Sequence, residues 1–389
     1  MTNPRLFLDI HVLQTIPPSN LNRDDSGTPK QAIYGGVRRA RVSSQAWKRA
    51  TRKYFSETVP LVEQATRTKR VTALLARSLT EKAGLSPDQA ARLAVAVLAP
   101  LGVKPKRNKD GTPDVDGDTA YLLFFGRAQL DRIADQAVSK FPEGINDLTD
   151  DELAAAVADI RAQDELMAGH PLDVALFGRM VADLTSLNVD ASVQVAHALS
   201  THGVEFEYDY YTAVDDEKNR AAGDDAGAGM IGTVEFNSAT LYRYATMGVH
   251  QLIDNLGGDG THTIEGARRF LEGFVRSMPT GHQNTFAHRT LPDAVVLVAR
   301  TDQPVNLVSA FEKPVRADNG YKTGSLIALA NEFQRVSDQW EGHPELVASL
   351  YAEDAHEQVK ACFGAPVTFD EVLAATENTV AGYLAGTSS

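Results

Sequence analysis

The stretch LFLDIHVL, residues 6–13, alternates regularly, and every second residue in it is Leu, Leu, Ile or Val. A period of two places these apolar side chains on one face of a β-strand. Pro17 and Pro18 follow shortly afterwards. Because proline has no backbone N–H to donate to a neighbouring strand, we expect the strand to end there. The chain therefore begins with a strand that packs one face against a core.

The next part of the chain carries a strong concentration of positive charge. Residues 36–55 read GVRRARVSSQAWKRATRKYF and contain seven basic residues and no acidic one. Two segments of turn-forming residues precede it, at residues 22–27 (NRDDSG) and at residues 34–36 (YGG), and we expect both to face a ligand. The seven basic residues are Arg38, Arg39, Arg41, Lys48, Arg49, Arg52 and Lys53.

The second half of this basic stretch has the pattern of an amphipathic helix. If Ser43 or Ser44 caps a helix through Tyr54, the last four basic residues fall on one arc and Trp47, Ala50 and Tyr54 fall opposite. Like charges four residues apart destabilise a helix by a few tenths of a kcal/mol, which suggests a counter-anion. The serine hydroxyls and free N–H groups at the positive helix end favour phosphate.

A merely solvated basic face is the competing interpretation of the helix alone. The arginines that directly precede it, and a Gly35–Gly36 pair that would let a backbone approach closely, favour a groove for a polyanion. Such a groove suits sugar-phosphate contacts better than the reading of bases.

The rest of the chain interleaves strands and helices. Residues 60–179 are rich in Ala, Leu and charged residues and predict helices, interrupted by a loop at 102–118. Residues 201–232 contain eight acidic residues and few regular signals, which predicts a long mobile loop. This order predicts an α+β sheet domain that carries a helical insertion and a loop insertion. Strands are expected at 234–244, 294–299 and 307–311, and helices at about 263–277 and three times after Gly324.

The composition limits the classes of protein to which the chain can belong. The 389 residues carry a net charge of -13, and 43% of them are hydrophobic, without an apolar run of the roughly 20 residues that a bilayer span needs. Residues 1–5 do not resemble a secretory signal, so a cytoplasmic location without membrane association is expected. The single cysteine, Cys362, excludes an internal disulfide and a thiolate-rich zinc site.

Sequence patterns of enzymes and cofactor sites are incomplete in this chain. Residues 227–232 match GxGxxG but lack the strand before and the helix after that a dinucleotide site requires. His197 and His202 are five residues apart, with no third metal ligand nearby, so no metal site is expected. The main alternative is a metal-dependent ribonuclease that uses the carboxylate pairs Asp24–Asp25 and Asp215–Asp216. We expect no enzymatic activity and no cofactor.

Seven co-linear motifs identify a family resemblance that runs from the first strand to about Phe311. The chain resembles the CasC family, the backbone subunit of the type I-E CRISPR Cascade complex. The matching motifs are LNRDD, AIYGGVRRARVSSQAWKRATRK, ALFGRM, NVDASVQVAHALSTH, DYYTAVDD, AGAGMIGTVEFNSATLYRY and PTGHQNTFAHR.

The resemblance implies an RNA-recognition-motif-like (ferredoxin-like) palm with a large helical fingers insertion and a long thumb loop. The implied boundaries are palm at 1–59, 180–200 and 236–389, fingers at 60–179 and thumb at 201–235. It also implies that several copies wrap one CRISPR RNA, together with other Cascade subunits, and leave its bases exposed to pair with target DNA.

Specific RNA-binding residues follow from the resemblance together with the basic pattern. Met180 would pack against bases beside the thumb, and His282 and Gln283 are further candidates. Because the thumb is acidic, with Asp215 and Asp216 near its centre, we expect it to dock on a basic surface of a neighbouring copy. The residues expected to hold the RNA backbone are Asn22, Arg23, Gly35, Gly36, Arg38, Arg39, Arg41, Ser43, Ser44, Gln45, Lys48, Arg49, Arg52 and Lys53.

Overall fold

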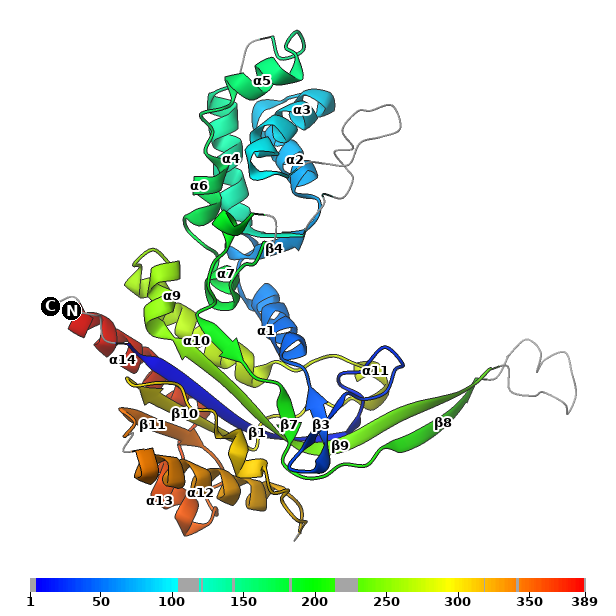
Figure 1. The fold of residues 1–389 in the computed structure, drawn as a ribbon, viewed down its shortest axis with the longest axis vertical. Helices are drawn as coiled ribbons and strands as arrows, with labels where there is room; N and C mark the ends of the chain where they lie inside the picture. The colour runs from blue at the N-terminus through cyan, green and yellow to red at the C-terminus, as the bar shows by residue number, and fades with distance from the viewer. Residues whose placement is uncertain are drawn as a thin grey trace, which may run out of the picture. The chain divides into compact units, whose positions relative to one another are not determined.

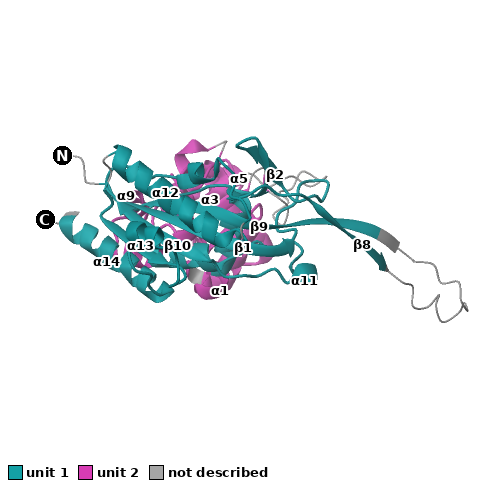
Figure 2. Ribbon diagram, turned by 90° about the horizontal axis from the view of Figure 1, so that it is seen from below, with its two compact units in different colours: residues 1–54, 194–248, 267–389 teal, residues 55–193, 249–266 magenta. Residues whose placement is uncertain are grey.

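The computed structural model divides into two compact units (Figure 2). The sheet unit comprises residues 1–54, 194–248 and 267–389, and the helical unit comprises residues 55–193 and 249–266. No helix among the described residues is long and apolar enough to cross a membrane. The structure describes residues 5–103, 119, 122–141, 144–181, 184–213, 230–317, 319–340 and 343–387.

The sheet unit is built on one large sheet of nine strands (Figure 1). Its strand order is β11-β10-β1-β9-β7-β3-β2, and each neighbouring pair in this order is antiparallel, while β6 and β8 also pair with β9. The predicted α+β class is confirmed. The strands are β1 Phe7–Ser19, β2 Gln31–Tyr34, β3 Val37–Val42, β6 Val193–Val195, β7 Ala198–Ser200, β8 Glu207–Ala213, β9 Met230–Gly248, β10 Ala294–Arg300 and β11 Leu346–Leu350.

Strand β1 forms where the alternating pattern predicts it, but both of its faces are buried. On the second face Asp9 accepts hydrogen bonds from the Tyr244 hydroxyl (2.8 Å) and from the Val305 N–H (2.9 Å), so its burial is compensated. The prediction that the strand ends at the two prolines is wrong. The strand continues to Ser19, and its pairing with β9 changes register between Ile16 and Ser19, where prolines cannot donate to the ladder.

Helices cover both faces of the sheet, and neighbouring residues of β9 pack against the helices of opposite faces. Tyr242 packs against Phe311, with ring centroids 5.1 Å apart, on the face covered by α12 and α13. The next residue, Arg243, points to the opposite face, between Trp47 of α1 and Phe274 of α10. The helices of these two layers are α1 Ser44–Thr58, α10 Gly260–Arg276, α12 Lys322–Trp340, α13 Glu357–Phe363 and α14 Phe369–Thr387.

Two predicted segments of the sheet unit take other structures. Residues 307–311 form the 3-10 helix η4 (Leu307–Phe311) instead of a strand, and the Asn306 side chain caps it by accepting from the Val308 N–H (3.0 Å). The acidic segment is not a loop throughout. Strands β8 and β9 pair from Glu207↔Phe236 to Ala213↔Met230 as a ribbon that extends beyond the rest of the sheet (Figure 1). Residues 214–229, with Asp215 and Asp216, lie outside the described residues.

The helical unit matches the predicted helical segment in part. It also contains a two-stranded antiparallel sheet, β4 Ala65–Thr68 with β5 Leu123–Gly126, which the Ala- and Leu-rich composition did not indicate. The helices of this unit are α2 Val71–Ala83, α3 Pro87–Leu98, α4 Arg127–Ser139, α5 Asp150–Ala156, α6 Ala162–Met167, α7 Leu172–Phe177 and α9 Val249–Asn255.

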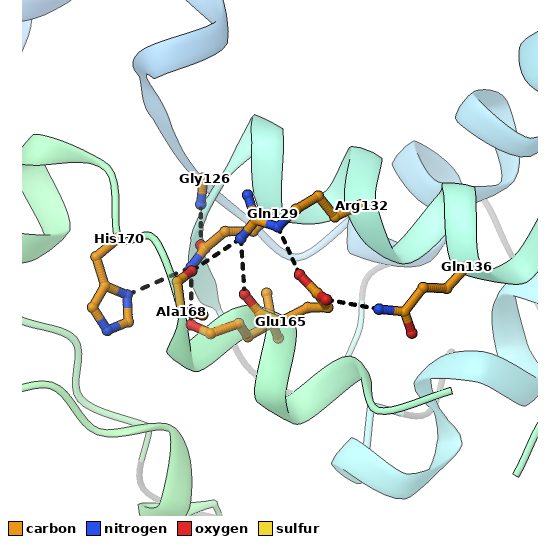
Figure 3. A network of polar contacts seen from close by, with 8 residues as sticks. Gly126, Gln129, Arg132, Gln136, Glu165, Ala168 and His170 are labelled. Carbon is orange, nitrogen blue, oxygen red and sulfur yellow. Dashed lines mark hydrogen bonds and ion pairs between the residues drawn. The ribbon is translucent and has the colours of Figure 1, made fainter. Parts of the chain in front are cut away.

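A polar network ties α4 to α6 inside the helical unit (Figure 3). Gln129 accepts from the Gly126 N–H (2.8 Å) and donates to two backbone carbonyls at the end of α6. The Glu165 carboxylate accepts from Arg132 Nε (2.6 Å) and from Gln136 Nε2 (2.7 Å). These hydrogen bonds join α4 to α6 and so fix the pairing of the two helices.

Candidate nucleic-acid interface

Side chains from two other segments fix the start of the basic helix α1. Of the two serines expected as its N-cap, Ser43 takes this position, because its Oγ accepts from the Ala46 N–H (3.3 Å). The Ser43 N–H donates to Asn22 Oδ1 (2.8 Å), and the Ser44 N–H donates to His197 Nδ1 (3.1 Å). The expectation that these two N–H groups are free for an anion is therefore wrong, since side chains of the protein occupy both.

The back of α1 is packed firmly into the sheet unit. Trp47 is only 1% exposed, and the guanidinium carbon of Arg243 lies 3.7 Å from the centroid of its ring. Arg243 donates to Gln14 Oε1 (2.5 Å) and to the Phe274 carbonyl, and burial lowers its pKa to about 9. Thr51 adds a hydroxyl contact of 3.3 Å to Ser277, the residue that follows α10. The helix cannot rotate without breaking these contacts, so its outer face has a fixed orientation.

The front of α1 presents the predicted arc of positive charge. Gln45, Arg49 and Lys53 are exposed, while Lys48 and Arg52 are partly buried along their stems. Burial lowers the pKa of Lys48. Because the apolar residues of this helix face inward and its cations outward, the amphipathic pattern expected from the sequence is confirmed.

The arginines before α1 occupy three different settings. Arg41 donates through Nε to the Gln31 carbonyl (3.1 Å) on the neighbouring strand. Arg38 is exposed and lies 5.8 Å from the centroid of the Phe206 ring. Arg23 Nη1 donates to His282 Nε2 (2.8 Å), and Gln283 beside it is exposed. The structure thus brings Arg23 next to His282 and its neighbour Gln283, although Arg23 is far from both in the sequence.

Arg39 serves the fold, which contradicts the expectation that it lies on an RNA surface, and the exposed Gly35 also has a structural role. The Arg39 side chain is fully buried and donates to the carbonyls of Tyr34, Ser200, Phe311 and Glu312. A Cβ on Gly35 would lie 1.7 Å from the Glu312 carbonyl oxygen. The close backbone approach predicted at the glycine pair exists, but the approaching backbone is the protein's own. Gly36 has a positive φ of 73° and open space around it.

The ALFGRM motif builds a corner of the helical unit that presents Met180. The Arg179 guanidinium is buried and donates to the carbonyls of Leu187, Phe124 and Leu166, and burial lowers its pKa to about 10. Gly178 has a φ of 73°, and a Cβ there would lie 2.7 Å from the Val189 oxygen. Met180 itself is 85% exposed. An apolar side chain held outward in this way is available to pack against a ligand.

The carboxylate pairs do not form a metal site within the described residues. Asp24 accepts from the Ser26 N–H (2.9 Å), the Ser26 hydroxyl (2.7 Å) and the Thr28 N–H (3.1 Å), and these bonds lower its pKa. It is thus a turn residue. No group of three or more metal-binding side chains gathers in the described ranges. The second pair, Asp215–Asp216, lies outside them, and Met230 of the GxGxxG match begins a strand instead of a helix.

Sequence reasoning missed the contributions of His197 and Arg243. The spacing of His197 and His202 bears only on a metal site, whereas the structure places the His197 imidazole against the first turn of α1. Arg243 lies in a strand with apolar neighbours, and its burial depends on Trp47 and Phe274 from elsewhere in the chain. The only sequence signal for Arg243 is a basic side chain within the predicted strand 234–244, and His197 lies in no predicted strand, so neither residue's partner is indicated by the sequence.

A family model and two solved structures each match nearly the whole chain. The family model described as CT1975-like protein matches residues 8–375. A solved chain of a "CRISPR RNA-guided surveillance complex, pre-nicking" is 32% identical, with a TM-score of 0.82 over 96% of this chain and 100% of that one. A second chain, from a "CRISPR RNA-guided surveillance complex", is 28% identical, with a TM-score of 0.72 over 96% of this chain and 99% of that one. No curated protein sequence matches.

Proposed function

The chain belongs to the CT1975-like protein family, and from this premise we propose that it is the CRISPR RNA-binding backbone subunit of a type I-E Cascade surveillance complex. The family match and the solved relatives confirm the resemblance to CasC-type backbone subunits. In this function several copies lie along one guide RNA and present its bases for pairing with target DNA in antiviral defence.

The outer face of α1 carries the proposal. Its cations are held in one arc because Trp47 and Arg243 fix the back of the helix. A surface that is ordered before binding loses little entropy when a flexible RNA binds it. Lysines and arginines on such a face attract phosphate by releasing counterions, independently of sequence. The face therefore suits a subunit that must hold any guide sequence.

The other parts take complementary roles under this proposal. The sheet unit is the RNA-recognition-motif-like palm, and the helical unit supplies the fingers, with Met180 beside the bases. The β8–β9 ribbon is the base of the thumb. Arg23, His282 and Gln283 extend the basic surface on the side of the 22–27 turn.

The acidity of the β8–β9 ribbon supports the proposal that several copies of the chain assemble in a row. The described segments 203–213 and 230–238 contain the acidic residues Glu205, Glu207, Asp209 and Glu235 and no basic residue. An acidic ribbon and a basic helix on the same chain are complementary between two copies, and such a head-to-tail contact repeats without closing on itself. This arrangement would place cytoplasmic copies in a helical filament along the RNA.

A non-catalytic role is part of the proposal. A ribonuclease that uses the loop aspartates would need carboxylates able to bind a divalent ion. The hydrogen bonds that Asp24 accepts from its own turn favour a structural role for the first pair. Adding Mg²⁺ or Mn²⁺ to the RNA-bound complex tests this directly, since metal-dependent cuts in the bound RNA would contradict a scaffold role.

The decisive experiment is copurification of RNA with the protein and its neighbouring subunits. We expect an RNA of defined length with the wild type. We expect its loss when Lys48, Arg49, Arg52 and Lys53 are all changed to alanine. Unchanged RNA content in this variant would overturn the proposal.

Two double variants show whether RNA binding depends on where the positive charges lie or only on the net charge of the protein. Arg49→Ala with Lys53→Ala removes two charges from α1, and Arg335→Ala with Lys360→Ala removes two from α12 and α13 on the other face of the sheet. We expect the α1 pair to weaken RNA binding about tenfold. The slope of log affinity against log salt concentration should become shallower by about 0.7 for each phosphate contact that is lost. The control pair should stay within about twofold of the wild type.

A further inference from the structure

The helical unit contains a cavity between α2 and α4 to which the RNA-binding function assigns no role. Its volume is about 520 Å³, within the range of roughly 300–1,000 Å³ that small-molecule sites occupy. Four apolar side chains, four charged side chains and one serine line it. Apolar walls with a few polar groups are the usual composition of a site for a small ligand.

The two helices that form the walls of the cavity are joined directly to each other. Ser78 Oγ donates to Asp131 Oδ1 (3.3 Å), and Lys82 Nζ donates to Asp135 Oδ1 (2.5 Å). Both contacts join residues that are 53 positions apart, so α2 and α4 run side by side in the same direction. The polar network of Figure 3 also ties α4 to α6. The cavity is therefore formed before a ligand binds, which reduces the entropy lost on binding.

The apolar part of the lining favours a ligand with an apolar body. Phe125 and Leu130 are buried in the core of the helical unit, and Leu74 is partly buried against the same core. Leu61, which also lines the cavity, is 60% exposed. A ligand that covers Leu61 removes apolar surface from water, and this burial favours binding.

Arg127 indicates the charge of the ligand. Its Nε is buried and has no hydrogen-bond partner among the described residues. A buried donor without a partner costs free energy, which an acceptor in the cavity would recover. The guanidinium group matches a carboxylate, because the two can form a pair of parallel hydrogen bonds. The other charged residues of the lining are all more exposed than Arg127, and they are Arg77, Glu81 and Asp131.

The carboxylates of the lining limit how much negative charge the ligand carries. Glu81 and Asp131 balance the two arginines, so the charged residues of the lining sum to a net charge of zero. A polyanion such as RNA requires an excess of positive charge, which this lining does not provide. The balance therefore favours a ligand with a single charged group.

We propose that the cavity between α2 and α4 binds a small monocarboxylate with an apolar body, such as an arylalkanoate. The carboxylate accepts hydrogen bonds from the Arg127 guanidinium, and the apolar body packs on Leu74, Phe125 and Leu130. The proposal goes beyond the RNA-binding function and does not rest on it. Because the ligand binds the folded helical unit, it raises the stability of that unit by mass action.

The test measures the binding of three probes by isothermal titration calorimetry, with the full chain alone and in complex with its neighbouring subunits. Hydrocinnamate carries both the ring and the carboxylate, hydrocinnamyl alcohol has the same ring and chain length without the charge, and propionate lacks the ring. We expect hydrocinnamate to bind roughly ten- to hundredfold more tightly than the alcohol, the value of a hydrogen bond to a charged group. Propionate should bind more weakly than hydrocinnamate, because it covers less of the apolar lining.

Two arginine variants locate the binding of the carboxylate. Arg127→Gln should lower the affinity for hydrocinnamate to that for the alcohol, and the affinity for the alcohol should stay within about twofold of the wild type. Because Arg127 Nε has no partner among the described residues, the thermal midpoint of this variant should stay within about 2 °C of the wild type. Arg161→Gln is the matched control, since Arg161 is an exposed arginine of the same unit that does not line the cavity. It should bind hydrocinnamate as the wild type does.

Four results would overturn the proposal. The first is an absence of hydrocinnamate binding, or equal affinities for hydrocinnamate and the alcohol. The second is an equal loss of hydrocinnamate affinity in Arg127→Gln and Arg161→Gln. The third is binding to the free chain but not to the complex, since a neighbouring subunit then covers the cavity and the occupant is a polypeptide. The fourth is weaker RNA binding in Arg127→Gln, which would assign the cavity to the nucleic-acid surface.

Discussion

Helix α1 and the β8–β9 ribbon belong to the same sheet unit but are supported in opposite ways. The inner side of α1 is buried, and Trp47 at its centre is 1% exposed. Along its described length the ribbon is supported only near its base, where the Phe236 ring lies 5.7 Å from the Phe286 ring; farther along β8, Tyr208 and Tyr210 on one face are 65% and 63% exposed. Tyr211 on the other face is 41% exposed and covers Gly232. One surface is fixed by the core, and the other is held by its backbone ladder.

This difference indicates different kinds of partner. A charged surface with a rigid back suits a flexible polyanion, because the protein does not reorganise on binding. Exposed tyrosines on a projecting ribbon suit a folded surface, because their rings gain most when they are removed from water. We therefore assign the RNA to α1 and a second copy of the chain to the ribbon, as proposed above.

The largest expected effect comes from breaking the support of α1. Trp47→Ala removes the ring between α1 and Arg243 and leaves a cavity, so we expect the free energy of unfolding to fall by about 3–5 kcal/mol. Chemical denaturation measures this loss. RNA binding should weaken as well, because the buried Arg243 guanidinium would lose the ring that it packs against.

The other tryptophan provides a matched control. Trp340 at the end of α12 is 74% exposed, so Trp340→Ala should change the free energy of unfolding by less than about 0.5 kcal/mol. Similar losses in both variants would show that α1 is not held by its inner face. The contrast between the two regions would then lose its physical basis.

A smaller effect is expected from the ribbon, and it should leave the single chain intact. Changing Tyr208 and Tyr210 to serine removes exposed rings, so the thermal midpoint should stay within about 2 °C of the wild type. Binding to an RNA long enough for several copies should weaken about tenfold, because the contact between copies loses two aromatic groups. Binding to an RNA that holds one copy should not change.

Leu291→Ser is the control for this prediction, since Leu291 is an apolar side chain of the same unit that is 70% exposed. It should bind long and short RNAs as the wild type does. If the tyrosine variant weakens binding to the short RNA equally, the tyrosines contact RNA directly and the ribbon is not a surface for a second copy.

The sequence predicts the local parts of this design well. Strand β1 and helix α1 follow from periodicities of two and 3.6, because burial of an apolar face is what forms both elements. The Ser43 cap is equally local, since its partner is three residues away. These features need no knowledge of the rest of the chain.

Features set by distant partners were not predictable in the same way. The buried Arg39 resembles its exposed neighbours in sequence, but the carbonyls of Ser200 and Phe311 hold it in the interior. Residues 307–311 have the composition of a strand, and a 3-10 turn forms there instead, capped by Asn306. The role of His197 depends on a helix that begins 153 residues earlier in the chain. Tertiary contacts decide each of these outcomes.

The smallest effect is expected from the ribbon carboxylates, and its sign is more informative than its size. Glu207 and Asp209 are exposed and share one face of β8. If they attract the basic helix of a second copy, Glu207→Gln with Asp209→Asn should weaken binding to long RNA about twofold at roughly 0.15 M salt. The effect should vanish near 1 M salt, where the Debye length is only about 3 Å. If the same variant binds RNA more tightly, the carboxylates lie close to phosphates and repel them, and the ribbon must then be placed along the RNA instead of against a neighbouring α1.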